Sequence, residues 1–174
     1  MEFELNKSVE ILQRTPKILR ILLGNLPMDL THKNEGGDSW SAFDIIGHLI
    51  HGERTDWVPR AKILLGKNET KKFEPFDRFA HFELSKGKSL NELITQFEKL
   101  RSGNIEEVKN LRISINDLEL TGIHPELGTV TLKQLFATWV VHDFNHISQV
   151  SRVMAKQYKD EVGAWEAYLS ILHR

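Results

Sequence analysis

The sequence predicts an all-α protein: a four-helix bundle with long crossover connections and a short C-terminal helix. Three observations support this fold class. Apolar residues recur at helical spacing over four long segments. Three of these segments begin with a serine or threonine followed, three residues later, by a residue that completes a capping box. Two of the connections between the helices are long, and no segment shows the alternation typical of strands.

The composition indicates one soluble globular domain over residues 1–174. Hydrophobic residues make up 40% of the chain and charged residues 27%, as in most globular proteins. The formal net charge of −1 lacks the basic excess that binding to phosphate backbones requires, so we expect no direct nucleic-acid partner. No apolar run reaches the length of a membrane span, and the charged N-terminus lacks the apolar core of a signal peptide. We therefore expect a cytoplasmic protein without membrane contact.

The first helix is predicted over residues 3–26, with leucine and valine side chains as its apolar anchors. Pro16 falls in the middle of this segment, where it lacks the N–H that a helix needs and clashes with the preceding turn. Thr15 can cap a restarted helix that has Pro16 in its first turn. We therefore expect a kink or a short break, and then a polar, glycine-rich surface loop at residues 31–39.

The second helix is predicted to begin at Ser41, with Asp44 completing a capping box, and to end at Gly66. Its apolar residues surround much of the circumference, which is typical of a helix that is buried on more than one side. Pro59 predicts a bend. His48 lies within the apolar stretch, where an imidazole without a partner would cost free energy. His48 is therefore either an ordinary surface or packed histidine, or a histidine whose partner is a metal ion.

A long connection and a third helix follow. The connection, residues 67–88, contains four phenylalanines: Phe73, Phe76, Phe79 and Phe82. Aromatic side chains at this density should fold back over the bundle, either as simple packing or as a lid over a pocket. Ser89 and Glu92 then form a capping box for a helix whose apolar face continues to Leu111. Residues 113–130 form the second long connection.

The fourth helix, predicted over residues 131–158, carries a pair of histidines one turn apart. Thr131 begins it with another capping box. The Cβ atoms of His142 and His146 should lie about 6 Å apart, so both imidazoles can bind one metal ion. A short closing helix is predicted after it, over residues 158–174.

A metal site made of His48, His142 and His146 is the hypothesis that these positions support. The chain contains no cysteine, so a transition-metal site must use His, Asp or Glu. Three imidazoles would leave coordination positions for water or another ligand, as in catalytic zinc sites. Nitrogen ligands also suit nickel, iron or copper, so the residue types do not name the metal. The pair is not the H-E-x-x-H motif of metalloproteases, because the second position is Asp143.

Three further residues each have two interpretations. Asp143 falls near the centre of the apolar stripe, where we expect a structural pairing, for example with Arg14 or Arg20, rather than catalysis. Glu53 is expected to be a solvated glutamate. His124, in the loop before the fourth helix, is expected to hold that loop by a backbone hydrogen bond. The alternative for His124 is a place in the pocket, where it would handle protons or substrate.

Three segments together resemble the DinB-like superfamily of bacterial metal-binding helical bundles: WSAFDIIGHLIHGE, HPELGTVTLKQL and TWVVHDFNHISQV. The resemblance covers nearly the whole chain. It implies a four-helix bundle with crossover connections and one divalent metal ion, often nickel or zinc, bound by three histidines. By position these are His48, His142 and His146. Some relatives use a low-molecular-weight thiol, either as bacillithiol S-transferases or as mycothiol-dependent isomerases.

The expected function is that of a metal-dependent enzyme in which the ion activates a small thiol for attack on an electrophile, as in an S-transferase. Metal-assisted hydrolysis is the alternative within the enzyme class. A metal-stabilised stress or interaction protein is the non-enzymatic alternative. An open pocket beside the ion would favour an enzyme, and a closed site would favour the non-enzymatic alternative. The expected partners are a small-molecule substrate and, as a homodimer, a second copy of the chain.

Overall fold

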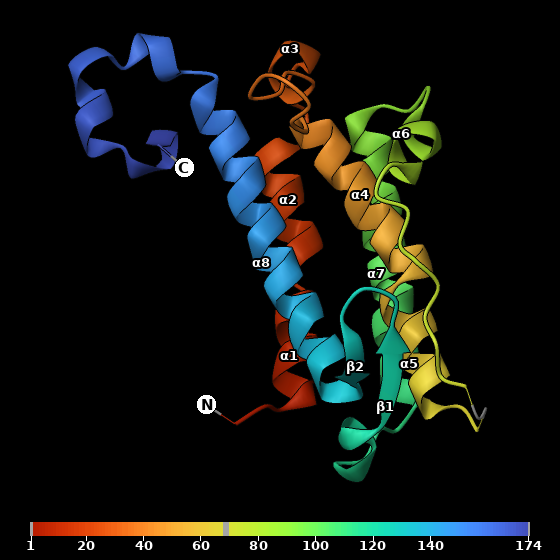
Figure 1. Ribbon diagram of the computed structural model, residues 1–174. Helices are drawn as coiled ribbons and strands as arrows, with labels where there is room; N and C mark the ends of the chain where they lie inside the picture. Colours follow the sequence, from red (N-terminus) through yellow and green to blue (C-terminus); the bar gives the residue numbers. More distant parts are fainter. Residues whose placement is uncertain (1, 68–69, 174) are drawn as a thin grey trace.

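The computed structural model describes residues 2–67 and 70–173. Within them, four helical rods form the bundle, and two of the rods consist of paired helices. The rods are α1 Leu5–Leu12 with α2 Thr15–Leu23, α4 Ala42–Thr55 with α5 Trp57–Leu65, α7 Leu90–Asn110, and α8 Leu132–Lys156. Figure 1 shows the rods running alongside one another. The predicted four-helix bundle is confirmed.

Three capping boxes begin the three helices for which the sequence predicts them. In each box the cap hydroxyl accepts the backbone N–H three residues later, and that residue's side chain accepts the backbone N–H of the cap. The pairs are Ser41 with Asp44, Ser89 with Glu92, and Thr131 with Gln134. Each box satisfies two N–H groups that have no partner inside the helix, which is why α4, α7 and α8 begin where they do.

Two prolines account for the two broken rods. Pro16 lies in the first turn of α2, as predicted, but the helix begins at Thr15 itself and Arg14 occupies the cap position. Pro59 lies in the first turn of α5, and the break falls three residues upstream, at Asp56. A proline ring excludes the carbonyl group four residues before it, so the break has to precede the proline.

Short elements occur within the connections. They are α3 Met28–Thr31, α6 Ala80–Ser85, the 3-10 helix η1 Asn116–Glu119, and the strands β1 Thr121–His124 and β2 Gly128–Thr131. The expectation that the chain has no strands was wrong, because β1 and β2 pair as an antiparallel hairpin with Thr121 opposite Thr131. The long connection at residues 67–88 pairs with β1 of this hairpin. The N–H of Ile123 donates to the carbonyl of Lys71 at 2.8 Å, and Phe73 donates back to Ile123 at 3.0 Å.

The C-terminal segment is short and helical, but it consists of three 3-10 helices in place of one regular α-helix. They are η2 Lys159–Glu161, η3 Gly163–Tyr168 and η4 Ser170–His173. Gly163, the first residue of η3, has φ 53°, a left-handed conformation that does not fit within a continuous α-helix. Leu172 is buried and η4 packs on α8, whereas Trp165 and Tyr168 are exposed. Among the helices of the described residues, none has both the length and the apolar character of a membrane span.

The core consists of two apolar clusters along the bundle. One includes Trp57, Phe136 and Trp139, and the other includes Ile46 and Phe97. The guanidinium group of Arg101, which is 1% exposed, lies 5.0 Å from the ring centroids of both Phe97 and Trp139. A buried charge on α7 thus lies between the two clusters.

Candidate metal centre

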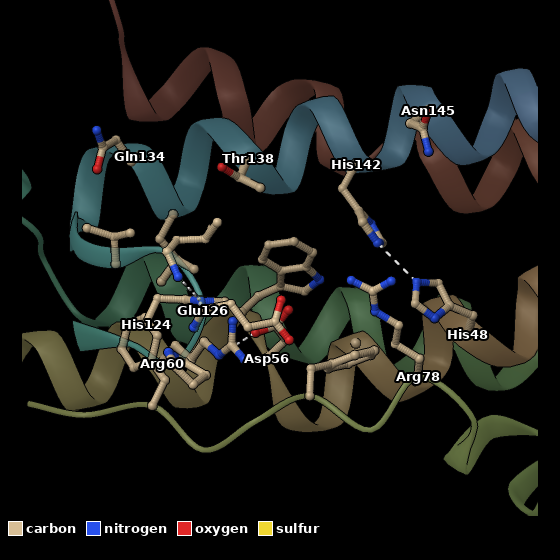
Figure 2. Close-up of a pocket in the computed structure, with 18 of the residues that line it drawn as sticks. His48, Asp56, Arg60, Arg78, His124, Glu126, Gln134, Thr138, His142 and Asn145 are labelled. Atoms are coloured by element: carbon tan, nitrogen blue, oxygen red, sulfur yellow. Dashed lines mark hydrogen bonds and ion pairs between the residues drawn. The ribbon is translucent and has the colours of Figure 1, made fainter. Parts of the chain in front are cut away.

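Three histidine side chains from two helices meet beside the bundle core. His48 comes from the middle of α4, and His142 and His146 come from adjacent turns of α8. Nε2 of His142 lies 3.2 Å from Nε2 of His48 and 3.1 Å from Nε2 of His146. Figure 2 shows His48 and His142 directed toward one another. The structure brings together all three residues that the sequence nominates, and the binding of a metal ion by them stays a prediction.

The spacing of the three rings fits a shared metal ion. Ligand atoms of the three side chains all lie within 4.8 Å of one another. Two nitrogens bound to one ion at about 2.0–2.1 Å lie roughly 3–3.4 Å apart, which agrees with the separations from His142 to the other two rings. Nδ1 of His48 and Nδ1 of His142 are buried without a hydrogen-bond partner among the described residues. An ion bound at Nε2 would leave the proton on Nδ1, so these two rings lack the outer hydrogen bond that His146 has among the described residues.

His146 has a partner that sets its orientation. Its Nδ1 lies 2.8 Å from Oε1 of Gln149, one turn further along α8. Because an amide oxygen only accepts hydrogen bonds, Nδ1 carries the proton and Nε2 keeps its lone pair for an ion. Histidines that bind metals typically have an outer partner of this kind.

The three rings are held in the neutral form that metal ligation requires. Burial lowers the pKa of His48 to about 3, and the neighbouring histidines and Arg78 add to the effect. Burial also lowers the pKa of His142 to about 2, with His146 and His48 as further causes. The pKa of His146 is lowered by burial as well. Neutral imidazoles leave their lone pairs available near neutral pH.

A pocket of about 580 Å³ opens beside the histidines. Its walls come from α4, α5, α8, the connection before α6 and the turn of the hairpin, as Figure 2 shows. Polar residues of α8 also line it: Gln134, Thr138 and Asn145. The pocket has room for a small organic molecule, far more than a single water would need.

His124 lies at the far end of this pocket from the three histidines (Figure 2). Its Nδ1 accepts hydrogen bonds from the N–H groups of Glu126 and Leu127, each at 3.2 Å. The expected hydrogen bonding between His124 and the loop backbone is confirmed. The same ring also lines the pocket, but it is not one of the converging ligand atoms. Burial, together with Arg60, lowers its pKa.

The connection at residues 67–88 folds back over the bundle in part. Phe73 is 5% exposed and Phe76 lines the pocket. Phe79 and Phe82, by contrast, are 67% and 40% exposed, so the expectation was wrong for these two residues. Residues 68–69 lie outside the described structure.

A buried ion network lies next to the candidate metal ligands on α4 and α8. Arg101 donates hydrogen bonds to Glu53 Oε1 at 2.8 Å and to Asp143 Oδ2 at 2.6 Å. It also donates to the backbone carbonyl of Leu12 at 2.8 Å. Asn104 and Trp139 are further donors to Glu53. The network ties α7 to both helices that carry the histidines.

Two expectations are corrected by this network. Asp143 has the structural pairing that we expected, but its partner is Arg101 and not Arg14 or Arg20. Glu53 is not solvated: it is 2% exposed, and burial raises its pKa although Arg101 opposes the rise. The sequence does hold a signal for the partner, because Arg101 lies four residues after Phe97, on the face of α7 that packs in the core.

Comparison with known proteins agrees with this architecture. The family model described as the DinB superfamily matches residues 11–150, a span that includes all three histidines. A solved structure, YfiT from Bacillus subtilis, is described as a probable metal-dependent hydrolase with an unusual four-helix bundle topology. It matches with a TM-score of 0.72 and 16% sequence identity, covering 91% of this chain and 87% of that one, a likeness of fold. No curated protein matches the chain significantly. The chain belongs to the DinB superfamily.

Proposed function

We propose that the chain is a metal-dependent enzyme that holds one divalent transition-metal ion, nickel or zinc, with His48, His142 and His146. It would act on a small molecule seated in the adjoining pocket. The observation that carries the proposal is the convergence of three neutral imidazoles on the wall of a cavity of about 580 Å³. When bound, an ion with an open coordination position supplies Lewis acidity, which lowers the pKa of a coordinated water or thiol.

The surrounding side chains provide orientation and a partly apolar environment. The ring of Trp57 lies 5.0 Å from that of His142, and the ring of Trp40 lies 4.8 Å from that of His48. These indoles keep water away from one side of the ligands, which strengthens electrostatic interactions in the site. Thr138 and Asn145 offer polar groups on the α8 wall for positioning a substrate.

Thiol transfer is the reaction that we propose first. The chain has no cysteine, so the thiol would be a separate low-molecular-weight molecule that shares the pocket with an electrophile. The pocket volume and the resemblance to thiol-dependent relatives support this choice. Hydrolysis is the second candidate, and the description of YfiT as a probable metal-dependent hydrolase supports it.

The test starts from metal content. The purified protein is analysed for bound metals, loaded with nickel or zinc, and assayed for two reactions. One is conjugation of a small thiol with 1-chloro-2,4-dinitrobenzene, and the other is hydrolysis of 4-nitrophenyl acetate. We expect a metal-dependent rate that disappears with a chelator and in His142→Ala. His173→Ala, at an exposed histidine near the C-terminus, is the matched control.

The result also separates the alternatives. Metal-dependent conjugation of the thiol with no ester hydrolysis supports the transferase. Metal-dependent ester hydrolysis in the absence of a thiol supports the hydrolase. If His142→Ala loses the metal but the wild-type protein catalyses neither reaction, the enzyme proposal is refuted. The hypothesis of a metal-stabilised, non-enzymatic stress or interaction protein then replaces it. If the wild-type protein and His142→Ala bind the same amount of metal, the three-histidine site itself is refuted.

A further inference from the structure

A positively charged side chain, that of Arg78, lies at the end of the pocket where the three histidines meet. Arg78 belongs to the connection between α5 and α6, and Figure 2 shows its guanidinium group directed toward His48 and His142. Among the described residues, no carboxylate forms an ion pair with this arginine. Its charge is therefore available to a ligand in the pocket.

The backbone on both sides of Arg78 is anchored. The ring of Phe76 packs against His48, with ring centroids 5.5 Å apart. The carboxylate of Asp77 accepts hydrogen bonds from two backbone N–H groups at the start of α6, at 2.9 and 3.2 Å, so it is occupied by the backbone. His81 is fully buried just after this turn. These contacts hold the arginine beside the histidines.

The other charged groups of the pocket do not compete for this role. Arg60 forms an ion pair with Asp56 at 2.5 Å, and its guanidinium lies 5.0 Å from the ring of Phe73. Glu126 is exposed on the hairpin turn near His124, at the opposite end from the three histidines (Figure 2). Near the candidate metal ligands, the lining therefore presents a single positive charge, that of Arg78.

We infer that Arg78 binds an anionic group, a carboxylate or a phosphate, on a ligand seated next to His48 and His142. The pocket would then select acidic small molecules. A guanidinium donates two parallel hydrogen bonds to either group, and these charge-assisted bonds are stronger than neutral ones. The inference rests on the proposed function in one respect: the proposed function places the reacting end of the ligand at the three histidines.

The test measures binding. Protein loaded with Co²⁺, whose visible spectrum reports its ligands, is titrated with acetate, with methyl phosphate and with neutral acetamide. The comparison is between wild type, Arg78→Gln and the matched control Arg54→Gln. Arg54 is an exposed arginine that lines a hollow against α7 rather than the pocket. We expect Arg78→Gln to raise the Kd of the anions by about 10- to 100-fold and to leave that of acetamide unchanged.

Each outcome decides the inference. Equal anion affinities in Arg78→Gln and Arg54→Gln overturn it, as does an equal loss for acetamide. A larger effect for one anion identifies whether the recognised group is a carboxylate or a phosphate. If wild type binds anions through Arg78 but catalyses nothing, the proposed function fails and this inference holds. If wild type binds no cobalt, calorimetric titration of the metal-free protein gives the same comparison.

Discussion

Substitution of Arg101 by methionine tests the buried network most directly. Arg101 and Asp143 are each 1% exposed and Glu53 is 2% exposed. Methionine retains the length and apolar stem of the side chain but removes the guanidinium that bonds both carboxylates. Two buried carboxylates would then remain without a counter-charge.

The expected loss follows from that geometry. Removing one partner of a buried ion pair costs about 3–5 kcal/mol, and here the remaining charges also repel one another. Domains of this kind are stable by about 5–15 kcal/mol. In a chain of this length, each kcal/mol shifts the melting temperature by about 2–4 °C, so Arg101→Met should melt roughly 6–20 °C below wild type.

The assay is denaturant unfolding of the metal-free proteins, with Arg20→Met as the matched control. Arg20 also bonds a carboxylate with two nitrogens, but its side chain and that of its partner Glu98 are 39% and 32% exposed. An exposed pair contributes at most about 1 kcal/mol. If Arg101→Met costs no more than Arg20→Met, the buried network does not stabilise the fold as we argue.

The loss should also depend on pH. Burial raises the pKa of Glu53, and Arg101 opposes that rise. Without the guanidinium the folded pKa lies further above the unfolded value of about 4.3. A group with a raised folded pKa contributes stability below its unfolded pKa, and this contribution is lost as the pH rises through the folded pKa. The difference from wild type should therefore be smaller at pH 4.5 than at pH 7, and a constant difference would exclude the carboxylates as its cause.

Three further predictions concern the site. Gln149→Leu should lower metal affinity by about 10- to 100-fold in competition with a chelator, whereas Gln96→Leu on α7 should not. Because the folded pKa values of His48 and His142 are lowered to about 3 and about 2, their contribution to stability is present above the unfolded pKa of about 6.5 and is lost as the pH falls toward those values. The metal-loaded protein should therefore melt at a lower temperature in acid or with a chelator, and indifference to both would contradict a metal-stabilised fold. His124→Ala should cost about 1 kcal/mol at unchanged metal content, while His124→Asn, whose amide oxygen can accept the same backbone N–H groups, should restore part of that loss.

The features of the fold that the sequence predicts are those determined locally. A capping box needs only four consecutive residues, so Ser41, Ser89 and Thr131 mark their helix starts without any knowledge of the tertiary structure. The hairpin is different, because its strands are four residues long and Ile123 on one edge pairs with Lys72, far away in the sequence. At Gly122 an added Cβ would lie 2.5 Å from a side-chain atom of Leu64, a close approach that no local pattern reveals.

The site divides in the same way. The spacing of His142 and His146 is local, and the apolar neighbourhood of His48 is visible in the sequence, so these ligands could be nominated. Glu53 could not be assigned, because its burial depends on which helix covers the far side of α4. That helix is α7, and the covering residue is Arg101.

The network and the candidate metal centre are built from the same two helices. On α4, His48 faces the pocket and Glu53 faces Arg101; on α8, the adjacent residues His142 and Asp143 divide the two roles in the same way. Arg101 thereby fixes α4 against α8 directly behind the positions where their imidazoles meet. A shift of either helix against α7 would break hydrogen bonds to Arg101 and would also move an imidazole away from its neighbours. The buried network would thus align the candidate ligands through the packing of α4 and α8 on α7.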